Sequence, residues 1–132
     1  LCLEDGGRAR QIFADIDSNV HISLVFRYLD TFPKPPGVPE WPNLIPPTPP
    51  EQIDKNIDNG LIAVGDPEEV TRAVQRFADI GADQVSFGML SSSMPIEVCE
   101  EAVATFGQHV LPRFDKDPVH STTRQRQAQI GH

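Results

Sequence analysis

The chain begins with a short apolar stretch that leads into a helical pattern. Residues 1–3 are apolar and residues 4–7 are acidic or glycine, which is typical of the last residues of a strand and the loop that leaves it. From Arg8 to about Phe32, apolar residues recur every four positions. They are Ile12, Ile16, Val20, Leu24 and Tyr28. Polar residues 17–19 interrupt this spacing, so the pattern predicts one long helix or two short ones.

The next stretch, residues 33–50, holds nine of the thirteen prolines. It can therefore form neither a regular helix nor a central strand, and an extended connection is expected. Trp41, Leu44 and Ile45 favour a segment that covers a surface of its own protein. The alternatives are a flexible linker and a polyproline II ligand for a partner domain. A short helix is expected over residues 48–59, with Thr48 or a neighbour as its cap.

Residues 61–88 give the strongest pattern. Residues 61–64 are an unbroken apolar run, typical of a parallel strand that is buried on both faces. Asp66 is placed as the N-cap of a helix, because a proline follows it directly and Glu69 stands three residues later. The helix has one apolar stripe and ends at Gly81. The stripe consists of Val70, Ala73, Val74, Phe77 and Ala78. Residues 84–87 would be a second strand, which completes a strand–helix–strand unit.

A third amphipathic helix is expected to begin near Pro95 and to end at Pro112, and residues 115–132 form a polar tail. The order of elements is then strand, helix, proline-rich connection, short helix, strand, helix, strand, helix. Such alternation predicts the α/β class, in a single domain that spans residues 1–132.

Composition narrows the function classes. The net charge of −8 and the pI near 4.8 argue against a nucleic-acid partner, since such a partner requires clustered Lys and Arg. No apolar run approaches the ~20 residues that cross a bilayer, and no signal peptide pattern is present, so a cytoplasmic protein with no membrane partner is expected. Cys2 and Cys99 indicate neither a disulfide framework nor a metal site, and we expect both to be buried apolar residues.

Function in α/β folds lies at the carboxyl ends of the strands, and three places qualify. They are Cys2 and Glu4, Gly65 and Asp66, and residues 88–93. We interpret Asp66 as a structural cap, whereas Glu4 and Asp5 are either another cap or solvated acids. The serines at 91–93 either hydrogen-bond a phosphate or polar ligand, or form a loop with a spare cap. No catalytic motif is present, and His109 in a last helical turn is interpreted as structural.

One resemblance goes further than these patterns. The stretches LIAVGDPEEVTRAVQRFADIGADQVSFG and MPIEVCEEAVATFGQHVLPRFDKDPVH resemble the C-terminal end of the luciferase-like monooxygenase family. The specific elements are the VGDPEEV turn into a helix, the GADQ pair and FGQHVLPRF at the end of the final helix. The resemblance covers about residues 60–120 well and the first third only loosely.

The resemblance implies the C-terminal portion of a (β/α)8 TIM-type barrel, with about three parallel strands and their covering helices. It implies an oxidoreductase that uses reduced flavin and oxygen on a small organic substrate, with FMN or a deazaflavin as cofactor. Contacts to substrate or flavin would come from the loop after the last strand. Its residues are Gly88, Met89, Leu90, Ser91, Ser92 and Ser93.

The catalytic residues would lie upstream, in the family's first five strands, so this chain alone would not be catalytically competent. Two open sheet edges would favour a homo-oligomer. The alternatives are a non-catalytic truncated half-barrel that self-associates, and an interaction module that presents the Pro/Trp segment 33–50 to a partner.

Overall fold

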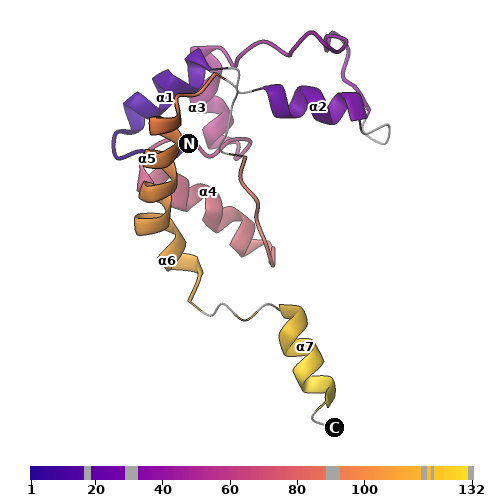
Figure 1. Cartoon of the computed structure of the whole chain (residues 1–132), viewed down its shortest axis with the longest axis vertical. Coiled ribbons are helices and arrows are strands. Elements are labelled where there is room, and N and C mark those ends of the chain that lie inside the picture. Colours follow the sequence, from indigo (N-terminus) through magenta and orange to yellow (C-terminus); the bar gives the residue numbers. More distant parts are fainter. Residues whose placement is uncertain (17–18, 29–32, 89–92, 117–118, 120, 131–132) are drawn as a thin grey trace.

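The computed structural model describes residues 1–132 except 17–18, 29–32, 89–92, 117–118, 120 and 131–132, and the chain it shows is helical (Figure 1). Helices account for most of the described residues, and the extended structure among them is limited to one isolated bridge. The helices are α1 (Gly6–Asp15), α2 (Val20–Tyr28), α3 (Pro50–Asp58), α4 (Pro67–Asp79), α5 (Ile96–Thr105), the π-helix η1 (Phe106–Val110), α6 (Leu111–Phe114) and α7 (Ser121–Ile130).

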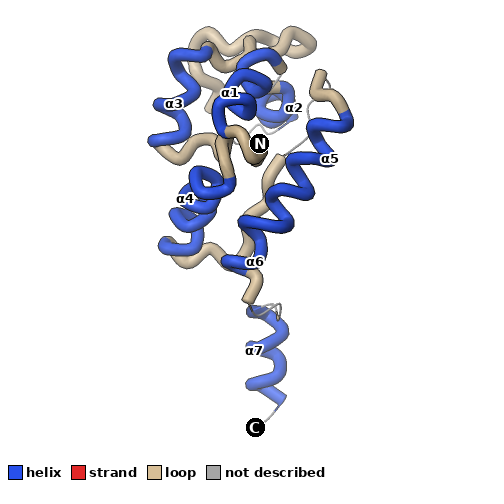
Figure 2. The backbone as a smooth tube through the Cα atoms, turned by 90° about the vertical axis from the view of Figure 1, so that its left-hand side faces the viewer, coloured by secondary structure: helices blue, strands red, loops and turns tan. Residues whose placement is uncertain are grey.

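The predicted α/β class, and with it the partial TIM-type barrel, is wrong. No sheet is present in the described chain, and Figure 2 shows helices and loops throughout it. The first two expected strands meet only in an isolated parallel bridge between Cys2 and Gly65. The third, residues 84–87, is without regular structure.

The physical reason lies in the pairing that parallel strands require. A parallel strand is stable when neighbours pair with it and helices cover both faces of the sheet. Here Val64 is buried, but Leu61 at the other end of the same apolar run is largely exposed. Gln84 and Ser86 are also exposed, so residues 84–87 lack the apolar faces that would hold them in a sheet.

The helices agree better with the sequence patterns. Residues 8–32 form two short helices among the described positions, α1 and α2. Helix α4 begins after Asp66 as expected, and Gly81 follows its end with a φ of +80°. Helix α3 has Pro49, the neighbour of Thr48, at its N-cap, and no side-chain hydrogen bond caps it. Pro112 does not end the last amphipathic helix, because it lies inside α6.

Two buried apolar clusters hold the body of the molecule together. One consists of Cys2, Val70, Val74 and Val110, and the other of Leu3, Ala9, Val64 and Ala102. The N-terminal residues therefore pack between α4 and the continuous helix formed by α5, η1 and α6. Helix α7, in the polar tail, lies apart from these helices in both views (Figures 1 and 2).

The proline-rich segment is mostly exposed and is held at one end. The Ile45 N–H donates to Ser23 Oγ at 3.0 Å, and Asn19 Nδ2 donates to the Pro46 carbonyl at 2.5 Å. Both contacts attach residues 45–46 to the start of α2. Within the described chain, no helix is long and apolar enough to span a membrane.

Candidate functional site

The candidate site is the edge at which two extended segments end and two helices begin. The Leu1 nitrogen donates to Ala63 O at 2.7 Å, Gly65 N–H donates to Leu1 O at 3.0 Å, and Leu3 N–H donates to Gly65 O at 3.1 Å. The two segments therefore run parallel, and the chain leaves the bridge in the same direction after each of them. Because α1 starts at Gly6 and α4 at Pro67, both helix N-termini lie at this edge.

Both helices are capped by an aspartate. Asp5 Oδ1 accepts the Arg8 N–H at 3.0 Å, and Asp66 Oδ1 accepts the Glu69 N–H at 2.8 Å. Glu69 returns the contact, because its Oε2 accepts the Asp66 N–H at 2.9 Å. This reciprocal capping box confirms the structural role predicted for Asp66. Asp5 is also a cap, which resolves the alternative left open by the sequence.

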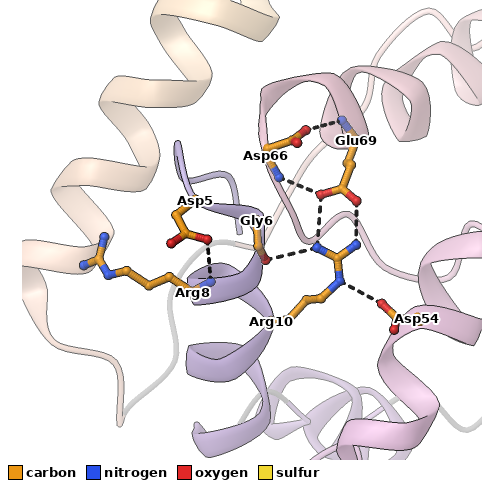
Figure 3. Close-up of polar contacts among 7 residues, drawn as sticks. All are labelled: Asp5, Gly6, Arg8, Arg10, Asp54, Asp66 and Glu69. Carbon is orange, nitrogen blue, oxygen red and sulfur yellow. Dashed lines mark hydrogen bonds and ion pairs between the residues drawn. The ribbon is translucent and has the colours of Figure 1, made fainter.

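An arginine from α1 joins the two helix starts (Figure 3). Arg10 Nη2 lies 2.5 Å from Glu69 Oε1, and Arg10 Nη1 lies 3.1 Å from Glu69 Oε2. The same Nη1 donates to Gly6 O at 3.0 Å, and Nε donates to Asp54 Oδ1 of α3 at 2.7 Å. The planar guanidinium thus binds one carboxylate with two bonds and a second with one, which a lysine could not reproduce.

These contacts shift the ionisation of both partners. The Arg10 hydrogen bond is the main cause that lowers the pKa of Glu69, and burial opposes it. The hydrogen bond from Glu69, followed by that from Asp54, raises the pKa of Arg10. At neutral pH the pair is therefore fully charged, and the carboxylate of Glu69 is held by three hydrogen bonds. A carboxylate in that state is a structural group and a poor general base.

Two glycines allow the helix starts to come this close. A Cβ on Gly65 would lie 2.2 Å from Glu69 Oε2 and 2.9 Å from Glu69 Cβ. A Cβ on Gly6 would lie 2.7 Å from the same Oε2. Gly65 also has a φ of +149°, which side-chain-bearing residues rarely adopt. The capping box therefore requires glycine at position 65 for both space and conformation.

Cys2 lies beneath this edge and is chemically inert in the folded protein. Its side chain is buried, and burial raises the pKa of the thiol to about 11. The nucleophilic form of cysteine is the thiolate, which is then nearly absent at neutral pH. Cys99 is also buried, so the expectation that both cysteines are buried apolar residues is confirmed.

A histidine–carboxylate contact and an ion pair connect the edge to the continuous α5–η1–α6 helix. His109 Nε2 lies 3.0 Å from Glu4 Oε1, and Arg8 Nη1 lies 2.6 Å from Glu101 Oε1. All four side chains are substantially exposed. His109 therefore links the π-helix η1 to the loop before α1 at the surface.

A shallow cavity of about 210 Å³ adjoins the Arg10–Glu69 pair. Its lining carries three arginines and three carboxylates. The lining residues are Arg10, Asp54, Ile57, Asp58, Glu69, Arg72, Ala73 and Arg76. The mixed charge and small volume suit water or a small polar molecule, and they do not fit the apolar, three-ring face of a flavin.

The predicted binding loop lies elsewhere, ahead of α5. Gly88 is exposed, and a Cβ placed on it would have no neighbour within 4 Å. Ser93 is also exposed, at the other end of the loop. Met89, Leu90, Ser91 and Ser92 lie outside the described residues. The structure therefore gives the two ends of the predicted site, both at the surface.

Among the described residues, no group of three or more His, Cys, Asp or Glu side chains could hold a metal ion. The sequence patterns missed the bidentate pairing of Arg10 with Glu69, since the two residues are 59 positions apart. The only available signal was Glu69 at the third helical position, which predicts the bond to the Asp66 N–H and nothing about α1.

The chain matches no family model, no curated protein and no solved structure.

Proposed function

We propose that this chain is part of a cytoplasmic, luciferase-like oxidoreductase that uses reduced flavin or deazaflavin and oxygen on a small organic substrate. The proposal rests on the sequence resemblance over about residues 60–120. One structural observation supports it: two parallel segments, residues 1–3 and 63–65, each continue directly into a capped helix. Such an edge fixes the starts of α1 and α4 in one arrangement, and the loop assigned to binding lies apart from it, ahead of α5.

The role assigned to this chain is to contribute one wall of the binding site. Gly88 leaves the backbone open to close approach by a flat ring, and Ser93 supplies a hydroxyl group at the other end of the loop. Both residues lie at the surface, so the remaining walls would come from other parts of the enzyme. The cofactor supplies the redox chemistry when bound, and the residues here bind and orient.

A flavin titration tests this proposal. FMN and a deazaflavin, each oxidised and reduced, are titrated by fluorescence into this chain and into the whole polypeptide that its gene encodes. Saturable binding to either is expected. In the protein that binds, Gly88→Leu should weaken affinity at least tenfold by blocking approach to the backbone, whereas Ala104→Leu on exposed α5 should leave it unchanged. Absence of binding in both proteins would overturn the proposal.

A second candidate function is recognition by a partner that binds proline-rich segments. The observation that favours it is the exposure of Pro46, Pro47, Pro49 and Pro50, together with φ and ψ of −59° and 143° at Pro49. These angles belong to polyproline II, the conformation that SH3 and WW domains bind.

Trp41, the only tryptophan of the chain, provides the readout for this candidate. Its emission is recorded while isolated SH3 and WW domains are added, in which every tryptophan is replaced by the non-fluorescent analogue 4-fluorotryptophan. Binding should change the Trp41 emission saturably, and Pro47→Ala combined with Pro49→Ala should abolish the change. Pro36→Ala, outside the recognised pair, should leave it intact. No response to any domain of either class would contradict this function.

A further inference from the structure

Helix α3 ends in a tight turn that contains the dipeptide Asn59–Gly60. The Gly60 N–H donates to Ile57 O at 2.9 Å. The Leu61 N–H donates to Asn56 O, also at 2.9 Å. Gly60 has a φ of +73°, in the left-handed region. These two bonds and this conformation form a Schellman motif, a turn with which many helices end at a glycine.

The side chain of Asn59 is not restrained by this turn. Asn59 is exposed, and within the described chain no hydrogen bond holds its amide group. The residue that follows is glycine, which has no Cβ to obstruct an approach to its backbone nitrogen. The side-chain carbonyl of Asn59 and the Gly60 nitrogen are therefore a pair that can react with each other when the backbone allows it.

The reaction that such a pair permits is deamidation. The Gly60 nitrogen loses its proton to water or hydroxide and bonds to Asn59 Cγ. The side-chain nitrogen takes a proton from water and leaves as ammonia, and a five-membered succinimide ring remains. Water then adds to either ring carbonyl and opens the ring, which gives aspartate or isoaspartate. Water is the only other reactant, and nothing is oxidised or reduced.

The folded turn keeps the reacting atoms apart. Asn59 has a ψ of −5°, so the Gly60 nitrogen nearly eclipses the Asn59 nitrogen and points away from Cβ and Cγ. Ring closure requires the Gly60 nitrogen to rotate until it eclipses Cβ, where it reaches Cγ. That rotation breaks the bond from the Gly60 N–H to Ile57 O. Deamidation therefore requires the last turn of α3 to open.

Arg76 of α4 holds the same turn from outside. Its Nη1 donates to Ile57 O at 3.2 Å, the carbonyl that also accepts the Gly60 N–H. A Cβ placed on Gly60 would lie 2.8 Å from this Nη1, so the guanidinium lies against the glycine. Arg72, one turn earlier on α4, makes no hydrogen bond to this turn among the described residues.

We propose that Asn59 is a deamidation site that the folded chain keeps closed, and that Arg76 helps to hold it closed. Opening of the last turn of α3 starts the reaction, so the modification records how often this turn opens. The isoaspartate product adds a methylene group to the main chain, which shifts the register of the two Schellman bonds. The inference is independent of the proposed flavin function.

Peptide mass spectrometry tests the site. The chain is kept at neutral pH, either folded or unfolded in guanidinium chloride, and is digested at acid pH at intervals to measure aspartate and isoaspartate at position 59. Conversion should be at least about tenfold slower in the folded chain. Asn19, Asn43 and Asn56 should stay unmodified in both states, because the side chains of valine, leucine and isoleucine after them obstruct the attack. Equal rates at Asn59 in the two states, or equally fast conversion of the other asparagines, would overturn the proposal.

Two exposed arginines of α4 provide matched variants for the role of Arg76. Arg76→Ala should raise the rate in the folded chain about threefold, because one exposed hydrogen bond to the turn is lost. Arg72→Ala should leave the rate unchanged. In guanidinium chloride both variants should react as fast as the unmodified chain, which separates the turn from any effect of charge on the reaction. Circular dichroism checks that the helices are intact. An unchanged folded rate in Arg76→Ala, or the same increase in Arg72→Ala, would overturn the role assigned to Arg76.

Discussion

Two segments of this chain share one sequence pattern and have different structures. Residues 61–65 and residues 84–88 both contain a predicted strand, end in glycine and precede an amphipathic helix, although polar Gln84 and Ser86 interrupt the second. The first segment bridges Cys2 and leads at once into α4 through a capping box. The second makes no bridge to any described residue, and α5 follows Pro95, which has no side-chain cap bond.

The difference shows which signals are local and which depend on the rest of the fold. The capping box needs only residues 66–69, so it forms wherever that tetrapeptide begins a helix. Strand pairing needs a second segment in register, and only the first apolar stretch has one, at residues 1–3. Phe87 instead uses its ring to pack on Phe106, with ring centroids 5.6 Å apart.

Among the variants that test this comparison, Gly65→Ala should have the largest effect on the free energy of unfolding. The new Cβ would overlap Glu69 Oε2 at 2.2 Å in a backbone conformation with φ of +149°. We expect the free energy of unfolding, measured by urea denaturation, to fall by about 3 kcal/mol. Gly88→Ala, in the second segment, is the matched control, because its Cβ meets nothing within 4 Å. Equal losses for the two variants would show that the edge at Gly65 is not closely packed.

Glu69→Gln should have the next largest effect, since the carboxylate binds Arg10 through two bonds and is only 19% exposed. A loss of about 1–2 kcal/mol is expected at pH 7. Because the pKa of Glu69 is lowered in the folded protein, the pair stabilises the fold above the unfolded pKa of about 4.3, and this contribution disappears as pH falls through the folded value. Unfolding curves of both proteins should therefore converge in acid, and a difference that persists there would contradict the ionic role.

The sequence predicted several local features correctly and missed the features that depend on contacts between distant residues. The positions of Asp66 and Gly81 follow from local spacing, and the structure confirms them. The spacing over residues 8–32 left open one long helix or two short ones, and the described residues form two. The α/β class depended on a sheet, which needs long-range pairing that spacing does not specify. The partnership of Arg10 and Glu69 likewise joins residues far apart in the chain. The role of Gly88 and Ser93 in a binding loop stays a prediction.

The cap residue Asp66 should make an intermediate contribution to the free energy of unfolding. Asp66→Ala removes the acceptor for the Glu69 N–H and should lower the free energy of unfolding by about 1 kcal/mol. Glu97→Ala, in the first turn of the uncapped α5, removes only a charge near a helix N-terminus and should cost about 0.3 kcal/mol. Amide hydrogen exchange in the first turn of α4 should accelerate in Asp66→Ala alone. Equal losses for both variants would mean that the α4 cap adds nothing specific.

The smallest effect is expected from Glu68→Gln, one residue from Glu69. Glu68 also pairs with an arginine, since Arg113 Nη1 lies 3.0 Å from Glu68 Oε2, and that hydrogen bond lowers its pKa. Its side chain is 64% exposed, however, so water and salt screen the pair. The urea midpoint of Glu68→Gln should match the unmodified chain at high salt and differ at most slightly at low salt. A loss as large as that of Glu69→Gln would show that burial does not explain the difference between these neighbouring glutamates.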